Sequence, residues 1–467
     1  MSKTVSLERF VVLFIPWILS ILFSLDPIVS YFIAWLGSFF IFFITLTGWV
    51  RPLPDDRTGA EQLMRPLFLV QIIFAGYMCC TSIFYFFSVL GYEDFHKIGT
   101  FYLVDQEQLK TTALCQRYYC LAHAAFASGI LTFMDYSYKK KYHVEIKSIA
   151  TLLFYCALIT LPLSILFLHL PGLNQFYNQF SALSFIAGTL ALAFAIPLKK
   201  VFNTAVCLVL YGFNFYQALI SGFKEPIIIS TLVLAVFLYP NYKKLVTFTF
   251  GPFLVLLFIF LPTYNRIFRQ NAWAEDADAK EASSVALDAT LNTSNPDNSN
   301  WGFLAYRLSE IDMFTTYVKS TPASINYYGF QLLKQSAIAI VPRVLWPSKP
   351  NTEELIMQRV YDAGVVNRNS DVSAKPPFVV DAYLSAGPFG IFIYLFAYGA
   401  IAQLISIKAE KLFGGYILGT ALIFSGLFQI MWRGLSFEFL INTVFWGFVS
   451  MIVIFKILRA RNILHQI

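Results

Sequence analysis

The chain has 467 residues, of which 57% are hydrophobic, 18% aromatic and only 13% charged, and its formal net charge is +7. Soluble globular proteins carry about 25% charged and about 45–50% apolar residues. The composition therefore excludes a soluble enzyme, a disordered protein and a disulfide-rich secreted domain, and it predicts an all-α polytopic membrane protein. In such a protein the positive charge indicates basic loops that contact membrane lipids, and it does not indicate a nucleic-acid partner.

Twelve apolar segments predict about twelve transmembrane helices, since roughly 20 apolar residues cross the ~30 Å hydrocarbon core of a bilayer. In chain order they lie near residues 10–25, 28–50, 67–90, 113–134, 149–170, 181–197, 201–221, 226–240, 245–263, 379–407, 414–432 and 437–456. We therefore divide the chain into transmembrane helices 1–9 (residues 1–263), a large loop (264–378) and transmembrane helices 10–12 (379–467).

The distribution of Lys and Arg predicts the orientation of these segments. If the N-terminus is cytoplasmic and the segments alternate, the cytoplasmic connections hold 18 of the 34 basic residues, the short outer turns hold 5 and the large loop holds 11. Short cytoplasmic loops are enriched in Lys and Arg. We therefore expect both termini in the cytoplasm and the large loop on the outer side.

The large loop is too long for a passive connection. Residues 274–300 are rich in Ala, Asp, Asn and Ser, whereas Trp301–Val318 and Tyr327–Trp346 show apolar residues at helical spacing. Such amphipathic helices lie on a membrane surface and can cap a cavity between spans. Because the soluble mass occurs once and no repeated halves are visible, the sequence disfavours transporters built from two repeated bundles.

Several Lys and Arg residues are expected on the outer side, where the rule that concentrates basic residues in cytoplasmic loops does not account for them. Arg binds phosphate oxygens with two parallel hydrogen bonds and keeps its charge in any environment. This predicts a site for a lipid-linked pyrophosphate. The alternative is that each side chain reaches for the phosphates of ordinary lipids. The candidate residues are Lys224, Arg266, Arg269, Arg307, Arg343, Lys349 and Arg433.

A general base is expected among the outer carboxylates. Asp381 lies at the mouth of the tenth span, where partial burial raises the pKa of a carboxyl toward a useful value. The alternative is a salt bridge in which Asp381 orients an arginine, and Glu438 is expected to pair with Arg433. The other candidate bases are Glu225, Glu310, Asp312 and Glu438. We expect no metal ion and no cofactor, because no paired carboxylates or Cys/His ligand spacings occur on an ordered element.

Two stretches resemble a known family. Val341–Pro350, with the sequence VPRVLWPSKP, resembles a Pro-Arg…Trp-Pro-x-Lys-Pro stretch in the periplasmic loop of Wzy-type O-antigen and enterobacterial common antigen polymerases. Asp381–Gly390, with the sequence DAYLSAGPFG, is similar to the acidic-x-Tyr-x-x-x-Gly-x-x-Gly stretch that opens their next span. Ser221–Lys224 looks like their Gly-x-Arg turn with Lys in place of Arg, and Arg433 looks like the Arg of a late outer turn.

The resemblance implies a GT-C-like glycosyltransferase at the periplasmic face of the bacterial inner membrane. Such an enzyme joins undecaprenyl-pyrophosphate-linked repeat units into a polysaccharide such as lipopolysaccharide O-antigen, and a separate co-polymerase usually sets the chain length. It implies catalytic roles for Asp381, Arg343 and Arg433. It also implies substrate or pyrophosphate binding by Lys224, Arg266, Arg269, Arg307, Lys349, Trp346 and Tyr383.

Three other functions remain open at this point. A flippase for the same lipid-linked sugar fits twelve spans equally well, but it should place charges near the membrane midplane. An O-antigen ligase shares the expected fold and site, but related ligases use a periplasmic His and the large loop contains none. An accessory subunit of an export complex is the third alternative.

Overall fold

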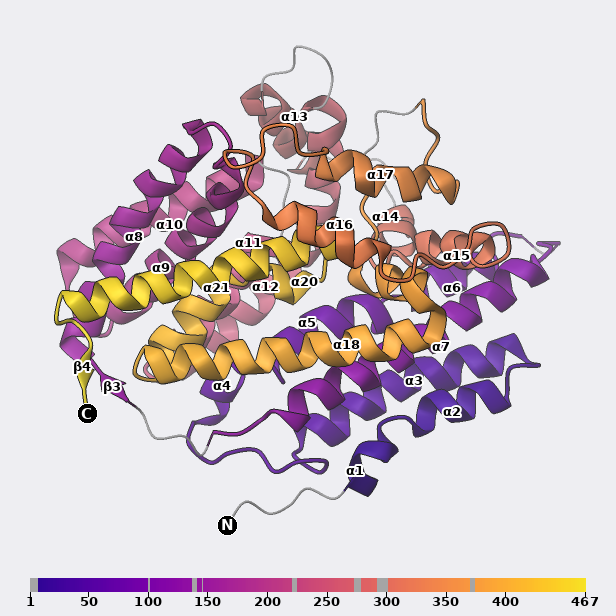
Figure 1. Ribbon diagram of the computed structural model, residues 1–467, viewed down its shortest axis with the longest axis horizontal. Coiled ribbons are helices and arrows are strands. Elements are labelled where there is room, and N and C mark those ends of the chain that lie inside the picture. The colour runs from indigo at the N-terminus through magenta and orange to yellow at the C-terminus, as the bar shows by residue number, and fades with distance from the viewer. Residues whose placement is uncertain are drawn as a thin grey trace.

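The protein is described by a computed structural model in which residues 7–99, 101–136, 141–144, 146–220, 225–272, 279–291, 301–369 and 374–467 are placed. These residues form helices, apart from two antiparallel strand pairs. Tyr92–Glu93 (β1) pairs with His96–Lys97 (β2), and Tyr142–His143 (β3) pairs with His465–Gln466 (β4). The prediction of an all-α membrane protein is confirmed at this level (Figure 1).

The first part of the chain forms the helices that surround α7. They are α1 (Leu7–Val12), α2 (Ile15–Leu22), α3 (Pro27–Leu46), α4 (Gly59–Gln62), α5 (Leu69–Ala75), the π-helical η1 (Gly76–Cys80), α6 (Ile83–Val89) and α7 (Gln106–Thr132). Asp26 and Asp105 precede α3 and α7, and each carboxylate accepts two backbone N–H groups of the first turn at 2.9–3.1 Å. These caps satisfy donors that have no partner within the helix.

The middle of the chain forms a second group of helices and the last part forms a third. The second group is α8 (Ile146–His169), the 3₁₀ turn η2 (Asn174–Phe176), α9 (Tyr177–Ala195), α10 (Val201–Ile220), α11 (Glu225–Leu238) and α12 (Lys243–Ala272). The third group is α18 (Phe378–Leu412), the π-helical η3 (Ile417–Phe424), α19 (Ser425–Leu427), α20 (Ile430–Arg433) and α21 (Phe437–Ala460).

Eight segments of the described chain are long and apolar enough to cross a membrane. They are Pro27–Leu46, Leu69–Val89, Ile149–His169, Tyr177–Ala195, Val201–Ile220, Lys243–Leu261, Phe378–Leu412 and Phe437–Ala460. Two shorter apolar helices, Pro226–Leu238 and Ile417–Leu427, coincide with two further predicted spans. The predicted spans at 10–25 and 113–134 are also helical, but the first is divided between α1 and α2 and the second belongs to the more polar α7.

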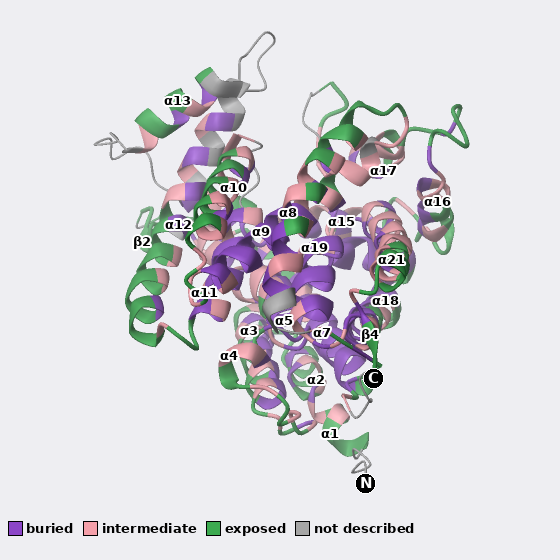
Figure 2. Ribbon diagram, turned by 90° about the vertical axis from the view of Figure 1, so that its left-hand side faces the viewer, coloured by how far each residue is buried: buried purple, intermediate pink, exposed green. Residues whose placement is uncertain are grey.

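The centre of the molecule is the seam between α7 and α18. A Cβ atom added to Gly129 of α7 would lie 2.1 Å from the carbonyl oxygen of Phe396, and one added to Gly399 of α18 would lie 2.1 Å from that of Phe126. Glycine is therefore required at both positions, because only its lack of a side chain lets the backbones approach so closely. Figure 2 shows α7 among buried, purple segments, whereas α10, α12 and α13 carry much exposed surface.

The large loop contains five helices in its described part. They are α13 (Ala279–Leu291), α14 (Trp301–Arg307), α15 (Ile311–Ser320), α16 (Gln331–Ile340) and α17 (Thr352–Asp362). The single helix predicted over 301–318 is wrong, because the backbone at Glu310 is left-handed, with φ 55°, and divides it into α14 and α15. The second predicted helix is shorter than expected, and α17 was not predicted.

Candidate functional site at the base of the large loop

Three charged side chains meet where the large loop rests on the spans. Arg359 of α17 donates from Nη1 to Glu438 Oε1 at 2.8 Å, and from Nη2 to Glu438 Oε2 and Asp381 Oδ2, both at 2.9 Å. The side chains of Arg359, Asp381 and Glu438 are 1%, 0% and 0% exposed. We call these three residues the buried triad. It ties α17 to the first turns of α18 and α21.

Local sequence explains why the three groups converge. The side chain of Asn351 accepts the Glu353 N–H at 3.1 Å and starts α17, whose buried face includes Arg359. Asp381 Oδ2 also accepts the N–H of Phe437 at 2.9 Å, at the start of α21. A carboxylate at a helix N-terminus satisfies an otherwise unpaired donor and interacts favourably with the helix dipole.

The triad leaves some of its hydrogen-bonding capacity unused. One arginine and two carboxylates give it a formal charge of −1. Burial works against the charge on Arg359, but Asp381 and Glu438 outweigh this effect and raise the pKa of its guanidinium. Within the described chain, Asp381 Oδ1, Arg359 Nε and the hydroxyl of Tyr317 are buried without a hydrogen-bond partner. Asp381 Oδ1 is therefore a buried acceptor, and it can receive a hydrogen bond only from a group that enters the site.

Aromatic side chains pack around Tyr383, which lies close to Asp381 in the chain. Tyr383, two residues after Asp381, donates its hydroxyl to the Thr321 carbonyl at 2.7 Å. Its ring lies 5.2 Å from that of Tyr118 and 5.6 Å from that of Phe314, measured between centroids. Tyr383 thus holds α15 against α7 and α18. Its predicted role in binding substrate gains no direct support from these contacts.

A second polar group lies around the start of α15. The hydroxyl of Tyr77 donates to the Arg307 carbonyl at 3.1 Å, and that of Tyr119 donates to the Ser309 carbonyl at 3.0 Å. Burial raises the pKa of Asp312, although backbone hydrogen bonds and the charge of Arg307 oppose this shift. Carboxylates and cations therefore gather along the end of the spans that carries the large loop.

Arg433 and Arg307 belong to this end of the molecule. Arg433 ends α20, which packs against α5, and the next residue, Gly434, has φ 72°. A Cβ at Gly434 would lie 2.3 Å from the ring of Phe74, so both its conformation and its space require glycine. Arg433 is half-buried and Arg307 is exposed. The structure therefore places Arg433 just before the start of α21, whose second residue, Glu438, belongs to the triad.

The VPRVLWPSKP stretch has a different environment from the triad. Arg343 is exposed on a turn that packs against Gly172, after the end of α8. The ammonium of Lys349 is buried and donates to the carbonyls of Ala339 and Val341 at 3.1 and 2.8 Å. Burial, and next the nearby Arg343, lower the pKa of Lys349. Lys349 therefore fixes the turn through its own backbone, and this geometry gives no support to a pyrophosphate ligand at this position.

The remaining predicted ligands are less well defined. Trp346 is partly exposed and donates its indole N–H to Ser348 at 3.2 Å. Arg266 and Arg269 belong to α12, but their side chains lie outside the described part of the structure. Lys224 falls in residues 221–224, which are also outside the described residues. These positions keep their predicted roles without a structural test.

Arg359 is the residue that sequence reasoning missed. The sequence presents it only as one of the 11 basic residues of the large loop and predicts that Glu438 pairs with Arg433, whereas the structure pairs Glu438 with Arg359. A usable signal existed, because Ile356 and Val360 lie on the same side of an 11-residue amphipathic segment as Arg359. An arginine on an apolar helix face needs a buried partner.

A second buried ion pair lies at the other end of α18. Arg57 donates to Glu410 at 2.5 Å and stacks on the ring of Tyr416, with 4.8 Å from the guanidinium carbon to the ring centroid. Glu410 is roughly 40 Å along the helix from Asp381. This pair is remote from the large loop, so we do not include it in the candidate site.

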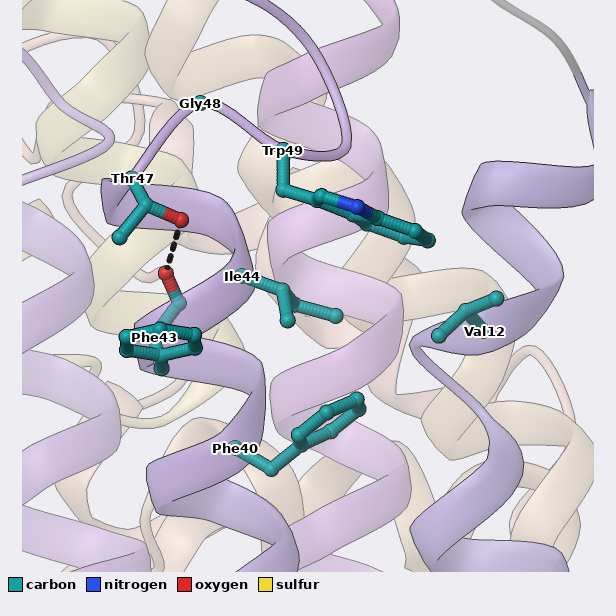
Figure 3. A pocket seen from close by; sticks show the side chains of 7 residues that line it. All are labelled: Val12, Phe40, Phe43, Ile44, Thr47, Gly48 and Trp49. Carbon is teal, nitrogen blue, oxygen red and sulfur yellow. Dashed lines mark hydrogen bonds between the residues drawn. The ribbon is translucent and has the colours of Figure 1, made fainter.

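An apolar recess of about 510 Å³ is also separate from the triad (Figure 3). Its one polar side chain, Thr47, donates its hydroxyl to the Phe43 carbonyl at 2.6 Å. Such a lining suits a hydrocarbon chain better than a reaction. The lining residues are Val12, Phe40, Phe43, Ile44, Thr47, Gly48 and Trp49.

In the described part of the chain, no three His, Cys, Asp or Glu side chains are grouped closely enough to hold a metal ion. The triad offers the chemistry of its own groups. Asp381 Oδ1 can accept a proton, and Arg359 can hold Asp381 and Glu438 in fixed positions. A base needs to lie within hydrogen-bond reach of the proton that it removes, so the cover formed by α15 and α17 must admit the substrate.

Comparison with protein families identifies one match. A family described as a domain of unknown function (DUF8712) matches residues 15–466, and the chain belongs to this family. The match includes all three triad residues and the large loop. Comparisons with curated proteins and with solved structures find no match.

Proposed function

We propose that this member of the DUF8712 family is a membrane glycosyltransferase that joins lipid-linked oligosaccharide repeat units, as the Wzy-type polymerases do. The observation that carries the proposal is the buried Oδ1 atom of Asp381, which has no hydrogen-bond partner in the described chain, in a carboxylate that Arg359 holds through Oδ2 at the junction of the large loop and the spans. The resemblance of VPRVLWPSKP and DAYLSAGPFG to those polymerases supports the same function.

The proposed reaction transfers a growing glycan between two lipid carriers. A hydroxyl oxygen of the incoming repeat unit bonds to the anomeric carbon of the glycan, and the bond from that carbon to undecaprenyl pyrophosphate breaks. The proton of the hydroxyl passes to Asp381 Oδ1. The electron pair of the broken bond stays on the pyrophosphate, which leaves with its lipid.

Cations near the triad stabilise the leaving pyrophosphate in this proposal. Arg433 ends α20, shortly before Glu438 in the chain, and Arg307 ends α14. Fixed positive groups in a site of low dielectric constant stabilise charge as it develops, without reorganisation of solvent. The proposed reaction requires no metal ion and no cofactor.

The proposal includes an orientation in the bacterial inner membrane. The apolar segments predict twelve spans, and the resemblance implies a GT-C-like arrangement. The distribution of basic residues predicts cytoplasmic termini and a periplasmic large loop. One contact supports placing the C-terminus and the basic connection after α7 on the same side of the membrane. Strand β4, near the C-terminus, pairs with β3 in that connection. In Figure 1, β3 and β4 lie at one end of α18 and α21, whereas α15 and α17 lie toward the other.

The test is a comparison of glycans in the host with and without the gene. A polymerase predicts that deletion leaves single repeat units on the carrier and removes the longer chains. Long chains that accumulate on the carrier would show a ligase instead. Repeat units retained at the cytoplasmic face would show a flippase, and an unchanged glycan profile would overturn all three functions.

A further inference from the structure

We infer that the turn Arg343–Trp346 inserts into the lipid leaflet on the side of the large loop and anchors this loop to the membrane. The inference rests on the chain crossing a membrane, and it does not depend on the proposed reaction. It gives the VPRVLWPSKP stretch a role that its distance from the triad leaves open. The partner is the bilayer itself.

The turn is rigidly attached to two helices that are long and apolar enough to span a membrane. The indole of Trp446 in α21 donates to the Ile340 carbonyl at the end of α16, at 2.8 Å. On the other side, the turn packs so tightly on Gly172, which follows α8, that an added Cβ would lie 2.7 Å from Val344 Cγ2. Gly172 has φ 76°, so both its conformation and its contact need glycine.

These two attachments give the level of the turn relative to the membrane. Trp446 lies nine residues after Phe437, the start of α21, which corresponds to roughly 13 Å along the helix. Gly172 comes three residues after His169, where the candidate span of α8 ends. The turn therefore lies beside one spanning helix and at the end of another. This is the level of the membrane boundary and not of the bulk water.

Three of the four side chains of the turn are apolar and exposed, although Val344 also contacts Gly172. Leu345 is 75% exposed, Val344 55% and Trp346 38%. In Figure 2, α16 lies beside α21 at the outer edge of the molecule, where lipid would surround it. Burial of such side chains in a bilayer is favourable. Trp is also the residue type enriched at the membrane boundary.

The polar groups of the turn are arranged to allow this insertion. Backbone N–H groups that lack partners are costly in hydrocarbon. Here the N–H groups of Leu345 and Trp346 both donate to the Pro342 carbonyl, at 3.0 and 3.1 Å. Lys349 turns its ammonium inward to the backbone, as described above, and Arg343 remains outside with a side chain long enough to reach lipid phosphates.

Spin labels would measure the depth of the turn directly. We would place a nitroxide at Leu345→Cys, and separately at Val344→Cys, in a cysteine-free full chain in nanodiscs. Collision with oxygen, which concentrates in lipid, would be compared with collision with a nickel chelate, which stays in water. A label at Phe448→Cys, an exposed position of α21, gives the lipid reference. A label at Gln358→Cys, an exposed position of α17, gives the aqueous reference.

The two outcomes are clearly separated. Insertion predicts that the labels at Leu345 and Val344 favour oxygen over nickel, as the Phe448 label does, while the Gln358 label favours nickel. If both turn labels are as accessible to nickel as the Gln358 label, the inference is wrong. Leu345 is highly exposed, so its substitution leaves packing intact, whereas Val344 also contacts Gly172. A single elution peak in size exclusion checks that both labelled proteins remain folded.

Discussion

Arg359 makes the charged contacts that join α17 of the large loop to Asp381 and Glu438. A buried ion pair often gains little over apolar packing, because desolvation offsets the attraction between the charges. Removing one partner is strongly destabilising, since it leaves the other charge buried and unpaired. In this protein, removal of Arg359 would leave both Asp381 and Glu438 without a cation.

The first prediction concerns stability. Arg359→Met should destabilise the protein by about 3–5 kcal/mol, the range observed when a buried pair is broken. The matched control is Arg368→Met, because Arg368 makes a 2.9 Å ion pair with Asp362 in which its side chain is 65% exposed. Exposed pairs contribute about 0–1 kcal/mol. Thermal unfolding in detergent measures both variants, and equal shifts would contradict the structural role of the triad.

The second prediction concerns the proposed base. Asp381→Asn keeps the size of the side chain but removes its ability to accept a proton, so polymer should be lost while folded protein still reaches the membrane. Asp362→Asn is the control, because it changes an exposed ion pair of the same loop. Surface glycans resolved by size in a complemented deletion host give the result. Full-length polymer from Asp381→Asn would remove Asp381 from the mechanism.

The third prediction concerns the outer cations. We expect Arg433→Ala and Arg307→Ala to abolish polymer without preventing insertion, because each removes a positive charge that can hold the pyrophosphate. Lys334→Ala tests whether loss of any exposed cation has this effect, since Lys334 is exposed on α16. Normal polymer from both arginine variants would exclude a pyrophosphate clamp at these positions.

At the scale of elements, apolar runs were enough to predict most of the fold. Each predicted span corresponds to a helical segment, because length and hydrophobicity are local properties of the sequence. The break between α14 and α15 was not predictable in this way. It depends on the left-handed backbone of Glu310, and on Tyr77 and Tyr119, which bind the carbonyls of Arg307 and Ser309 from distant parts of the chain.

The candidate site was also predictable only in part. Asp381 could be recognised because an acidic residue at the mouth of an apolar segment is unusual. Its partner could not be identified, since Arg359 lies 22 residues before Asp381 and 79 before Glu438. Several other cations of the loop were equally suitable by charge and spacing. Only the fold, which brings the Arg359 side chain of α17 to Asp381 and Glu438, selects one of them.

The fourth prediction tests the seam between α7 and α18. Gly399→Ala places a methyl group where the Phe126 carbonyl lies, so the helices must separate, at a cost of about 1–3 kcal/mol. Gly212→Ala in α10 is the control, because its added Cβ meets no atom within 4 Å. Yield and melting temperature in detergent compare the two. A Gly399→Ala protein as stable as the control would show that the seam is looser than described.

At the scale of the whole molecule, α18 connects two buried ion pairs. Asp381 near its start is held by Arg359, and Glu410 near its end is held by Arg57. The backbone between them is interrupted at Ala386 and Gly387, where φ and ψ are not helical. The helix is thus fixed at both ends and bent near the candidate site.

The fifth prediction concerns orientation. Alkaline phosphatase is active only in the periplasm, so a fusion after residue 360 should be active and one at the C-terminus inactive. Fluorescent-protein fusions should give the opposite pattern. The reason is the basic character of the connections that we place in the cytoplasm. An active phosphatase at the C-terminus would reverse the assignment of the two sides.

The most direct test of the proposed function is a reaction with purified components. The full chain in proteoliposomes would receive a synthetic undecaprenyl-pyrophosphate-linked repeat unit, and the lipid-linked products would be separated by size. We predict a ladder of longer glycans and release of one undecaprenyl pyrophosphate for each bond formed, with neither product from Asp381→Asn. The control is a known polymerase that extends its own substrate under the same conditions. If this control works while folded wild-type protein leaves the repeat units unchanged, the chain does not polymerise repeat units of this class and the proposal is contradicted.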